Sequence, residues 1–336
     1  MLAGGGFPRD ADGERREGRA RAAEEGPAVL TPALLADIGG THARFARAEG
    51  GRPGEALTLR VAEHPRFDDA LALARARLGA PPRFFCAVAG PVEAGRAALT
   101  NAPWVVEAAA LPFAEVRLLN DLEAMAWALP ALAPEEVEHW RTGTPVPEAP
   151  ALVIAAGTGL GLAVRHAGGV TATEAGHAAF APHDEEEEAL LAHLRARQGP
   201  VSQEDLLSGE GLPRLAAALA ALRRLPPPPA SAAALAEAAA RGEALPRAAI
   251  ALFWRALGGF CGDAALMHGA RGGVHLAGGA LARLLPFCDR AAFLARFDAK
   301  PRMAGYLARI PVRRIAHPEP GLLGLAVLAA TSSSAR

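Results

Sequence analysis

The chain carries two glycine-rich turns whose residue types suit the binding of phosphate. They are Asp37-Ile38-Gly39-Gly40-Thr41 and Gly157-Thr158-Gly159. Glycine lets backbone N–H groups approach a phosphate closely, Thr41 adds a hydroxyl donor, and the Asp37 carboxylate can hold a Mg²⁺-bound water. The alternative for the first turn alone is an ordinary hairpin that turns at glycine.

These two turns belong to an internal repeat. Each one follows an apolar run and precedes a second apolar-rich stretch, which is Ala43–Ala48 in the first copy and Leu160–Arg165 in the second. The repeat predicts two related domains that face one another, so that two turns can grip one polyphosphate from both sides. Because a strand rather than a helix follows the second turn, a dinucleotide-binding fingerprint does not fit.

A third glycine pair, Gly278-Gly279, lies between an apolar strand and a predicted helix. The strand is Val274–Ala277 and the helix is Ala280–Leu285. Backbone amides at the start of a helix can face a nucleotide phosphate. A plain strand-to-helix turn is the alternative interpretation.

Asn120-Asp121 follows the predicted strand Val116–Leu119 and precedes a helix. Catalytic groups commonly project from this end of a strand in α/β proteins. The Asp121 carboxylate could accept the proton of a hydroxyl that attacks phosphorus, while the Asn120 amide orients the molecule bearing that hydroxyl. The alternative is a helix cap, a role that Asn and Asp often fill.

Glu174-Ala175-Gly176-His177 offers hydrogen-bonding groups three residues apart on a tight turn. Such a pair suits two-point recognition of sugar hydroxyls. A metal site at His177 is disfavoured because no second histidine or cysteine lies at ligand spacing, and a structural histidine stays open. Glu204 lies early in a short predicted helix that ends at Gly209, where its alternative role is to match the helix dipole.

Composition excludes several classes of partner. The 336 residues include 35 basic and 36 acidic side chains, which leaves no electrostatic footprint for nucleic acid or an anionic membrane. The apolar run Leu322–Ala330 is far shorter than the roughly 20 residues of a membrane span. Three widely spaced cysteines without a CxxC pair argue against disulfides and zinc and favour a reduced, cytoplasmic setting. Residues 1–32 are predicted to be a disordered extension.

Apolar runs alternate with helical stretches along the chain, which predicts an α/β protein. The acidic run Asp184–Glu188 is interpreted as a solvated first helical turn that complements the helix dipole. The proline-rich segment Thr142–Pro150 is a candidate hinge between domains. Predicted strands are Ala33–Ala36, Arg83–Ala89, Val116–Leu119, Leu152–Ala155, Val274–Ala277 and Val312–Ala316.

Taken together, seven collinear segments resemble those of the bacterial glucokinase family. Each is weak alone, but their agreement in order along most of the chain is specific. The segments are Asp37–Arg44 (DIGGTHAR), Ala89-Gly90-Pro91 with Thr100-Asn101, Leu119–Glu123 (LNDLE), Ala156–Gly161 (AGTGLG), Glu174–Pro182 (EAGHAAFAP), Leu207-Ser208-Gly209 and Leu276–Ala280 (LAGGA).

The resemblance implies the two-domain actin-like ATPase (ribonuclease H-like) fold, with a nucleotide and sugar cleft between the domains. Residues 33–131 and 318–336 would form a small α/β domain, and residues 132–317 a large one. The implied reaction is phosphorylation of glucose at O6 by ATP with Mg²⁺, in a homodimer that binds neither nucleic acid nor membrane. No residue is assigned as a direct metal ligand, because Mg²⁺ would arrive with ATP, near Asp37 through water.

The same resemblance implies a role for each residue singled out above. Asp121 is similar to the catalytic base of the family. Glucose would be bound by Asn101, Asn120, Asp121, Glu174, His177 and Glu204, and ATP by Asp37, Gly39, Gly40, Thr41, Gly157, Thr158, Gly159, Gly278 and Gly279.

Two positions depart from the family pattern. His42 stands where asparagine is common, and Ala175-Gly176 replaces a usual pair of glycines. The His42 change bears on nucleotide affinity, whereas alanine is small enough at position 175 to matter little.

Three alternative functions share this kind of fold. A kinase of the other sugar-kinase group commonly has a cysteine-rich zinc motif beside its histidine, but here no cysteine follows His177 before Cys261. A sugar-responsive regulator would need a DNA-reading helix-turn-helix that residues 1–32 cannot supply. An actin- or chaperone-like ATPase would not need the sugar-binding set that includes Glu174 and Glu204.

Overall fold

The computed structural model describes residues 31–99 and 103–334. The predicted disordered extension, residues 1–32, therefore lies outside the described residues except for Thr31 and Pro32. The candidate sugar ligand Asn101 also lies outside them.

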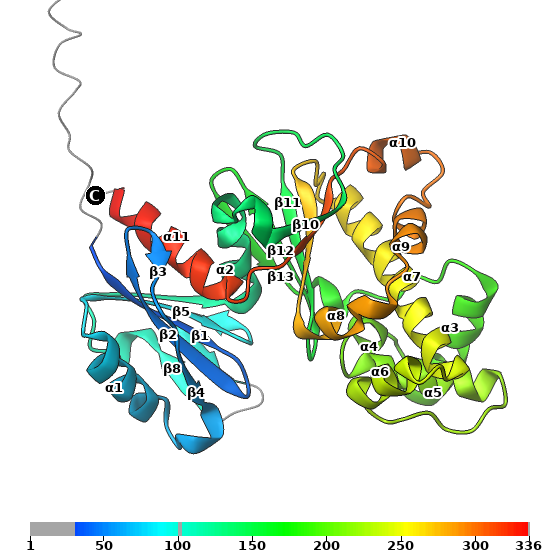
Figure 1. Cartoon of the computed structure of the whole chain (residues 1–336), viewed down its shortest axis with the longest axis horizontal. Helices are drawn as coiled ribbons and strands as arrows, with labels where there is room; N and C mark the ends of the chain where they lie inside the picture. Colours follow the sequence, from blue (N-terminus) through cyan, green and yellow to red (C-terminus); the bar gives the residue numbers. More distant parts are fainter. Residues whose placement is uncertain (1–30, 100–102, 335–336) are drawn as a thin grey trace, which may run out of the picture.

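The first of two large sheets is built around the strand that leads into the first glycine turn (Figure 1). That strand, β1, pairs antiparallel with β2 and parallel with β5, which pairs parallel with β9. The strands are, in spatial order, β3 (Arg52–Pro53), β2 (His42–Glu49), β1 (Ala33–Ile38), β5 (Arg83–Val88) and β9 (Glu115–Asn120), and β4 (Leu57–Arg60) also pairs with β2.

The second sheet repeats this arrangement around the second glycine turn. Its strand β11 pairs antiparallel with β12 and parallel with β14, as β1 does with β2 and β5. The spatial order is β10 (Val137–Arg141), β15 (Val312–Ile315), β14 (Gly273–Ala277), β11 (Ala151–Ala156), β12 (Leu160–His166) and β13 (Gly169–Thr173). The predicted strands and the internal repeat are thus confirmed.

Thr142–Pro150 is not the hinge that its proline content suggested. It links β10 to β11, which are strands of the same sheet. The described chain instead passes between the two sheets at residues 129–136 and again at residues 316–319.

Most of the helices, α3 to α10, lie with the second sheet, at the right of Figure 1. Helix α7 is long and apolar enough to cross a membrane by length and composition alone, but 72% of its most apolar window is buried inside the protein, as in a core helix. These helices are α3 (Glu185–Gln198), α4 (Glu204–Leu207), α5 (Gly211–Leu222), α6 (Ala232–Ala240), α7 (Ala244–Met267), α8 (Gly279–Leu284), α9 (Arg290–Phe297) and α10 (Ala304–Leu307). The first sheet carries α1 (Phe67–Leu78) and a small sheet of β6 (Val92–Glu93), β7 (Arg96–Ala98) and β8 (Val105–Glu107).

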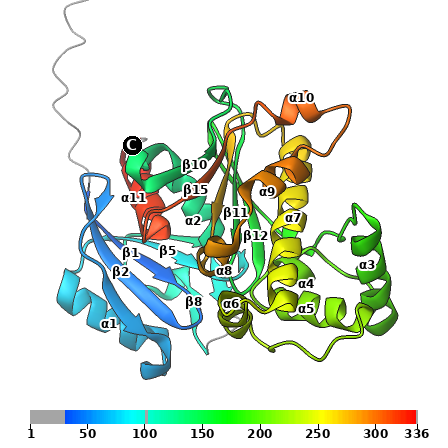
Figure 2. The same cartoon turned by 45° about the vertical axis from the view of Figure 1, so that its right-hand side comes forward.

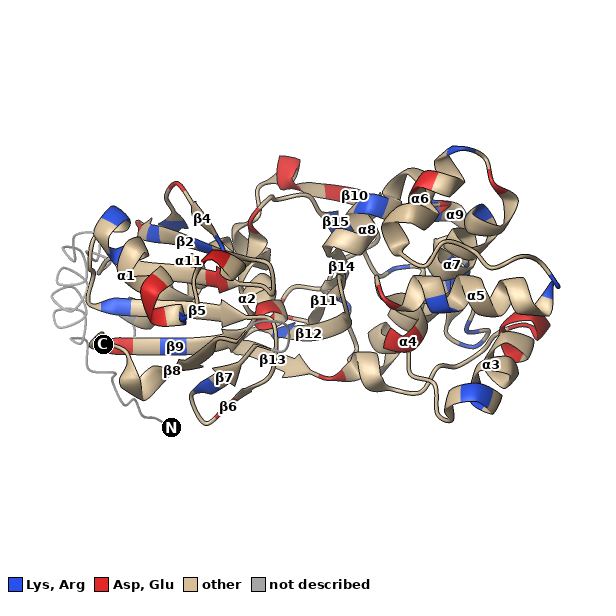
Figure 3. Cartoon of the chain, turned by 90° about the horizontal axis from the view of Figure 1, so that it is seen from below, with Lys and Arg blue, Asp and Glu red and all other residues tan. Residues whose placement is uncertain are grey.

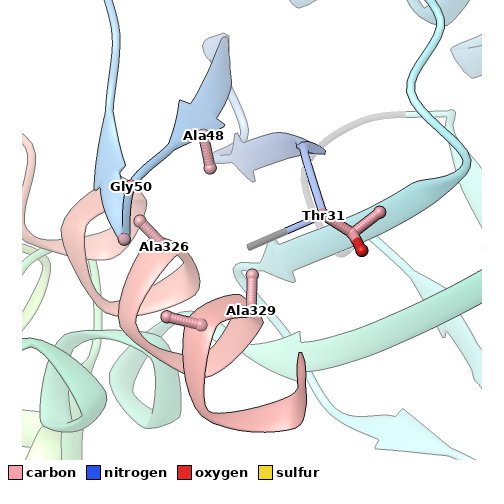
Figure 4. A pocket seen from close by; sticks show the side chains of 7 residues that line it. Thr31, Ala48, Gly50, Ala326 and Ala329 are labelled. Atoms are coloured by element: carbon pink, nitrogen blue, oxygen red, sulfur yellow. The ribbon is translucent and has the colours of Figure 1, made fainter. Parts of the chain in front are cut away.

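Two helices from distant parts of the chain pack together on the first sheet (Figure 2). They are α2 (Asp121–Ala128), which contributes Ala124 to a shared core, and α11 (Pro320–Ser334), which contributes Leu322 and Leu325. Farther along α11, the small side chains of Ala326 and Ala329 face the end of β2, where they leave little space (Figure 4).

Helix α2 also packs against the second sheet. Leu122 and Ala126 join a separate core cluster with Val153 of β11 and Ala163 of β12. In addition, the Arg165 guanidinium of β12 stacks 4.3 Å from the ring centroid of Trp127. Helix α2 therefore contacts both sheets.

The acidic run at the start of α3 is only partly explained by the helix dipole. As predicted, Asp184 caps the helix, with Oδ1 accepting the Glu187 N–H at 2.9 Å. The interpretation as a fully solvated turn is wrong for Glu187, which is buried and lies 3.5 Å from the Arg296 guanidinium. A distant arginine on α9 decides this burial, and nothing in the acidic run itself indicates it.

The close packing of α2 against α11 generates a stability prediction. A Cβ added at Gly324 of α11 would overlap the Ala124 carbonyl oxygen of α2. Gly324→Ala should therefore destabilise the protein by about 1–3 kcal/mol, measured by urea denaturation. The control is Gly305→Ala in α10, where a Cβ meets nothing within 4 Å, so its effect should stay within about 0.5 kcal/mol. Equal stability of the two variants would contradict the packing argument.

Candidate active site

The ends of β1, β5 and β9 place the predicted site residues Asp37 and Asn120 at the same edge of the first sheet. Ile38 pairs with Val88, and Val88 pairs with Asn120, so Asp37 and Asn120 lie at the same edge of the sheet. Asn120 does serve as a helix cap, because its Oδ1 accepts the Leu122 N–H at 2.9 Å. Its Nδ2 also donates to the Gly90 carbonyl at 3.2 Å, which fixes the amide where the helix begins.

Asp121 is a carboxylate whose surroundings favour proton acceptance near neutral pH. Its pKa is raised to about 6, mainly by burial and to a smaller extent by the Glu174 carboxylate. Hydrogen bonds from the amides of Leu122 and Asp121 and from Asn120 act in the opposite direction. Glu174, which follows the second glycine turn in sequence, therefore lies close enough to Asp121 for its charge to act on that carboxyl group.

Asp37 is perturbed in the same direction. Its pKa is raised to about 7, chiefly by burial and then by the charges of Asp121 and Glu319, while Arg44 acts to lower the pKa. Arg44 is the cross-strand partner of Asp37, and its Nε lies 3.1 Å from a Glu319 carboxylate oxygen. Gly321, in the first turn of α11, packs directly against the Asp37 carboxylate.

Arg44 and Glu319 are site residues that sequence reasoning did not single out. The β1–β2 hairpin pattern contains the signal for Arg44, because a tight turn places it opposite Asp37. No local pattern indicates that Glu319 returns to this place from the end of the chain.

Glu204 contacts the second glycine turn. Its Oε2 accepts the Leu160 N–H at 2.7 Å, so its carboxylate serves a neighbouring segment rather than the amides of its own short helix. The helix-dipole alternative is therefore incomplete. Gly209, just after this helix, donates its N–H to the Gly157 carbonyl at 2.8 Å.

The segment Glu174–His177 lies against the same turn. A Cβ at Gly176 would overlap the Leu160 carbonyl oxygen, which explains why glycine is needed at position 176 although position 175 accepts alanine. The Glu174 and His177 side chains are exposed, and the His177 N–H donates to the Glu174 carbonyl at 3.0 Å.

Gly278 and Gly279 lie beside the second turn, as the pairing of β11 with β14 requires. Gly278 has φ of +107°, and a Cβ there would overlap the Ala156 carbonyl oxygen, so this position needs glycine. Gly279 begins α8 and is exposed. The predicted helix Ala280–Leu285 is thus confirmed with a shift of one residue.

The first turn is bonded within its own sheet. The Gly39 N–H donates to the His42 carbonyl at 2.9 Å, and the Val61 N–H donates to the Thr41 carbonyl at 3.0 Å. Thr41 and Thr158 are both exposed at the ends of their strands. Across the described residues, no group of three or more His, Cys, Asp or Glu side chains is arranged to hold a metal ion.

Two sheets of repeated topology, each with a glycine turn after its central strand, define an actin-like ATPase fold, the class shared by sugar kinases. Solved structures agree. A glucokinase from an Antarctic psychrotroph superposes with a TM-score of 0.82 at 30% identity, over 90% of this chain and 99% of the other. A ROK-family glucokinase from Streptomyces griseus, solved with glucose and AMPPNP, shares the fold at a TM-score of 0.58 and 19% identity, over 89% of this chain and 99% of the other.

The chain belongs to the glucokinase family. A family model described as glucokinase matches residues 34–332. The glucokinase of Chromobacterium violaceum is 41% identical over 310 residues, which cover 88% of each chain. The resemblance and the fold class inferred from the seven sequence segments are confirmed.

The raised pKa of Asp37 predicts a pH-dependent gain in stability when its charge is removed. Because the folded pKa of about 7 exceeds the unfolded value of 3.8, the folded state binds more protons between these pH values, and its stability falls as pH rises. Asp37→Asn should therefore exceed the wild type in free energy of unfolding above pH 7. A shift of about three pKa units sets an upper bound of about 4 kcal/mol.

The measurement is urea denaturation of both proteins at pH 4.5, near the lower end of the window between 3.8 and about 7, and at pH 8, above that window. The advantage of Asp37→Asn should shrink toward the lower pH. Glu55→Gln, at an exposed carboxyl in the same half of the chain, is the control and should track the wild type at both pH values. An equal advantage at both pH values would rule out the titration of Asp37 as its cause.

Proposed function

We propose that this chain transfers the γ-phosphoryl group of ATP to the 6-hydroxyl of glucose, giving glucose 6-phosphate and ADP. The observation that carries the proposal is the place of Asp121, a carboxyl group in the first turn of α2 whose pKa is raised by burial to about 6 and which lies within electrostatic range of Glu174. Membership of the glucokinase family supports the sugar, and the Streptomyces griseus relative was solved with glucose and an ATP analogue.

In the proposed reaction Asp121 accepts the O6 proton as that oxygen attacks the γ-phosphorus. A general base works best when its pKa lies near the working pH, and burial brings Asp121 toward that range. Glucose would be held by Asn101, Asn120, Glu174, His177 and Glu204. The Oε2 atom of Glu204 is used by Leu160, which leaves Oε1 to accept a sugar hydroxyl.

The nucleotide would lie between the repeated turns. Amides of Gly39, Gly40 and Thr41 would face the phosphates from one sheet, and those of Gly157, Thr158 and Gly159 from the other. Gly278 and Gly279 would contact the adenosine side. Closing the cleft over glucose would exclude water, which competes as an acceptor of the phosphoryl group.

The residues fit Mg²⁺ that is carried by ATP rather than by a protein cage. Mg²⁺ usually keeps several waters and is bound by one or two carboxylates with substrate phosphates. Asp37 is a half-buried carboxylate within electrostatic range of Asp121, and we propose that it contacts the ion through water. When bound, the ion neutralises charge on the transferred group.

We also propose a small domain of residues 33–131 and 318–336, a large domain of residues 132–317, a cytoplasmic location and a homodimer. The free thiols of Cys86, Cys261 and Cys288 support a reducing compartment. The alternatives are a kinase for another hexose or an N-acetylhexosamine, and a sugar-responsive regulator, because hydrogen-bonding residues of the same types can bind several epimers.

The proposed function is tested by measuring ADP release with glucose, mannose, fructose, N-acetylglucosamine and no sugar. ATP and polyphosphate are compared as phosphoryl donors in the same assay. We expect glucose with ATP to give the highest kcat/KM, with little turnover when no sugar is present. Preference for another sugar would reject the glucose assignment, and sugar-independent turnover would reject the kinase.

The role of Asp121 is tested by Asp121→Asn, which keeps the size of the side chain and removes the base. We expect kcat to fall by about 10²–10⁴-fold, while ATP still binds in calorimetry. Glu123→Gln removes a neighbouring carboxyl on the same helix and should leave kcat within a few-fold of the wild type. Turnover of a folded Asp121→Asn protein near the wild-type rate would exclude Asp121 as the base.

A further inference from the structure

A groove between α3 and α5 lies outside the candidate active site. The two helices run side by side at the end of the molecule away from the first sheet (Figures 1 and 3). The groove encloses about 210 Å³. Its polar lining is His193, Arg197 and Gln198 from α3 and Arg214 from α5, and its apolar lining includes Ala217 and Ala221.

The charge of this groove suits an anion. His193 and Arg197 are four residues apart on α3, so both face the groove. Neither side chain makes a hydrogen bond or ion pair with another described residue, so both have donors to offer. None of the described residues that line the groove is acidic.

Arg214 links the groove to the segment that holds the predicted sugar ligands. Its Nη1 donates to Asp205 Oδ1 at 2.7 Å and to the Asp205 carbonyl at 2.9 Å. The other carboxylate oxygen, Oδ2, accepts the Ser202 N–H and the Ser202 hydroxyl, each at 2.9 Å. Asp205 therefore ties Arg214 to the start of α4.

The start of α4 in turn supports both sides of the sugar site. Ser202 forms an isolated antiparallel β-bridge with Ala179. The Gln203 N–H donates to the carbonyl of Ala178, the residue after His177, at 2.8 Å. Glu204, between Gln203 and Asp205, bonds to the Leu160 N–H of the second glycine turn. A displacement of Asp205 would therefore shift both the Glu174–His177 segment and Glu204, because residues 202–204 bond to both.

We propose that this groove binds a small phosphate ester and that the bound ester weakens glucose binding by drawing Arg214 away from Asp205. The phosphate would be held by Arg197, His193 and Arg214, and a short carbon chain would lie on the alanines of α5. Binding and release are non-covalent. The effect on glucose rests on the proposed function, whereas the binding of the ester does not.

The test uses the full chain with glycerol 3-phosphate as the probe and inorganic phosphate for comparison. Binding is measured by calorimetry with ADP present, both without glucose and with it, because glucose should weaken ester binding as much as the ester weakens glucose binding. Kinetics are measured with and without the probe. The variants are the double substitution His193→Gln with Arg197→Gln, and Arg195→Gln as a matched control on the same helix outside the groove lining.

We expect glycerol 3-phosphate to bind more tightly than inorganic phosphate and to raise the KM for glucose about fivefold or more. The KM for ATP and kcat should stay within about twofold, which separates this effect from competition at the nucleotide turns. The double variant should keep its basal activity and lose both binding and response, whereas Arg195→Gln should keep both.

Asp205→Asn tests whether the Arg214–Asp205 pair couples the groove to the predicted sugar ligands. It should raise the KM for glucose without any ester and remove the further response, while calorimetry still detects the ester. If Asp205→Asn fails to fold, Arg214→Lys replaces it and should also raise the KM for glucose, because it weakens the pairing with Asp205.

Binding that is unchanged in the double variant, or a wild type that does not bind the ester, would overturn the proposed site. Binding without an effect on the KM for glucose, in a protein that phosphorylates glucose, would overturn the coupling alone.

Discussion

The packing of α2 against both sheets at once is the constraint on which the rest of the structure depends. One side of this helix is pressed against α11 on the first sheet through Ala124, and another side is buried on the second sheet through Leu122 and Ala126. Asp121 and its cap Asn120 stand at the start of the same helix. The position of the carboxylate is therefore set by two hydrophobic cores rather than by a loop.

The same packing explains the electrostatics around Asp37 and Asp121. Withdrawing Asp37 and Asp121 from water favours their protonated forms, and their mutual repulsion adds to that effect on Asp37. Arg44 partly offsets the penalty at Asp37 but also pairs with Glu319. The two carboxylates are thus held in an unfavourable arrangement that the surrounding cores maintain, as is common where groups are prepared for chemistry.

Features set by short stretches of sequence were the ones that could be predicted. Apolar runs of the right length located the strands, and the glycine turns together with Asn120-Asp121 marked the strand ends where the candidate active site lies. The burial of Glu187 and the bond from Leu160 to Glu204 could not be predicted, because each depends on a partner far away in sequence. The prediction of a domain hinge at Thr142–Pro150 was wrong for a related reason. Prolines indicate a loop, but they do not show whether the strands on its two sides belong to one sheet or to two.

Helix α11 has a consequence for the order in which the protein is made. The first sheet is complete in its strands once residue 120 has been synthesised, but the helix that covers its core with α2 begins only at Pro320. A nascent chain must therefore carry the exposed apolar face of its first sheet until nearly all of the second half has been translated. Chains of this size fold domain by domain during synthesis and aggregate through surface left exposed. The half of the protein that emerges first is thus the half whose core is completed by the last helix to be made.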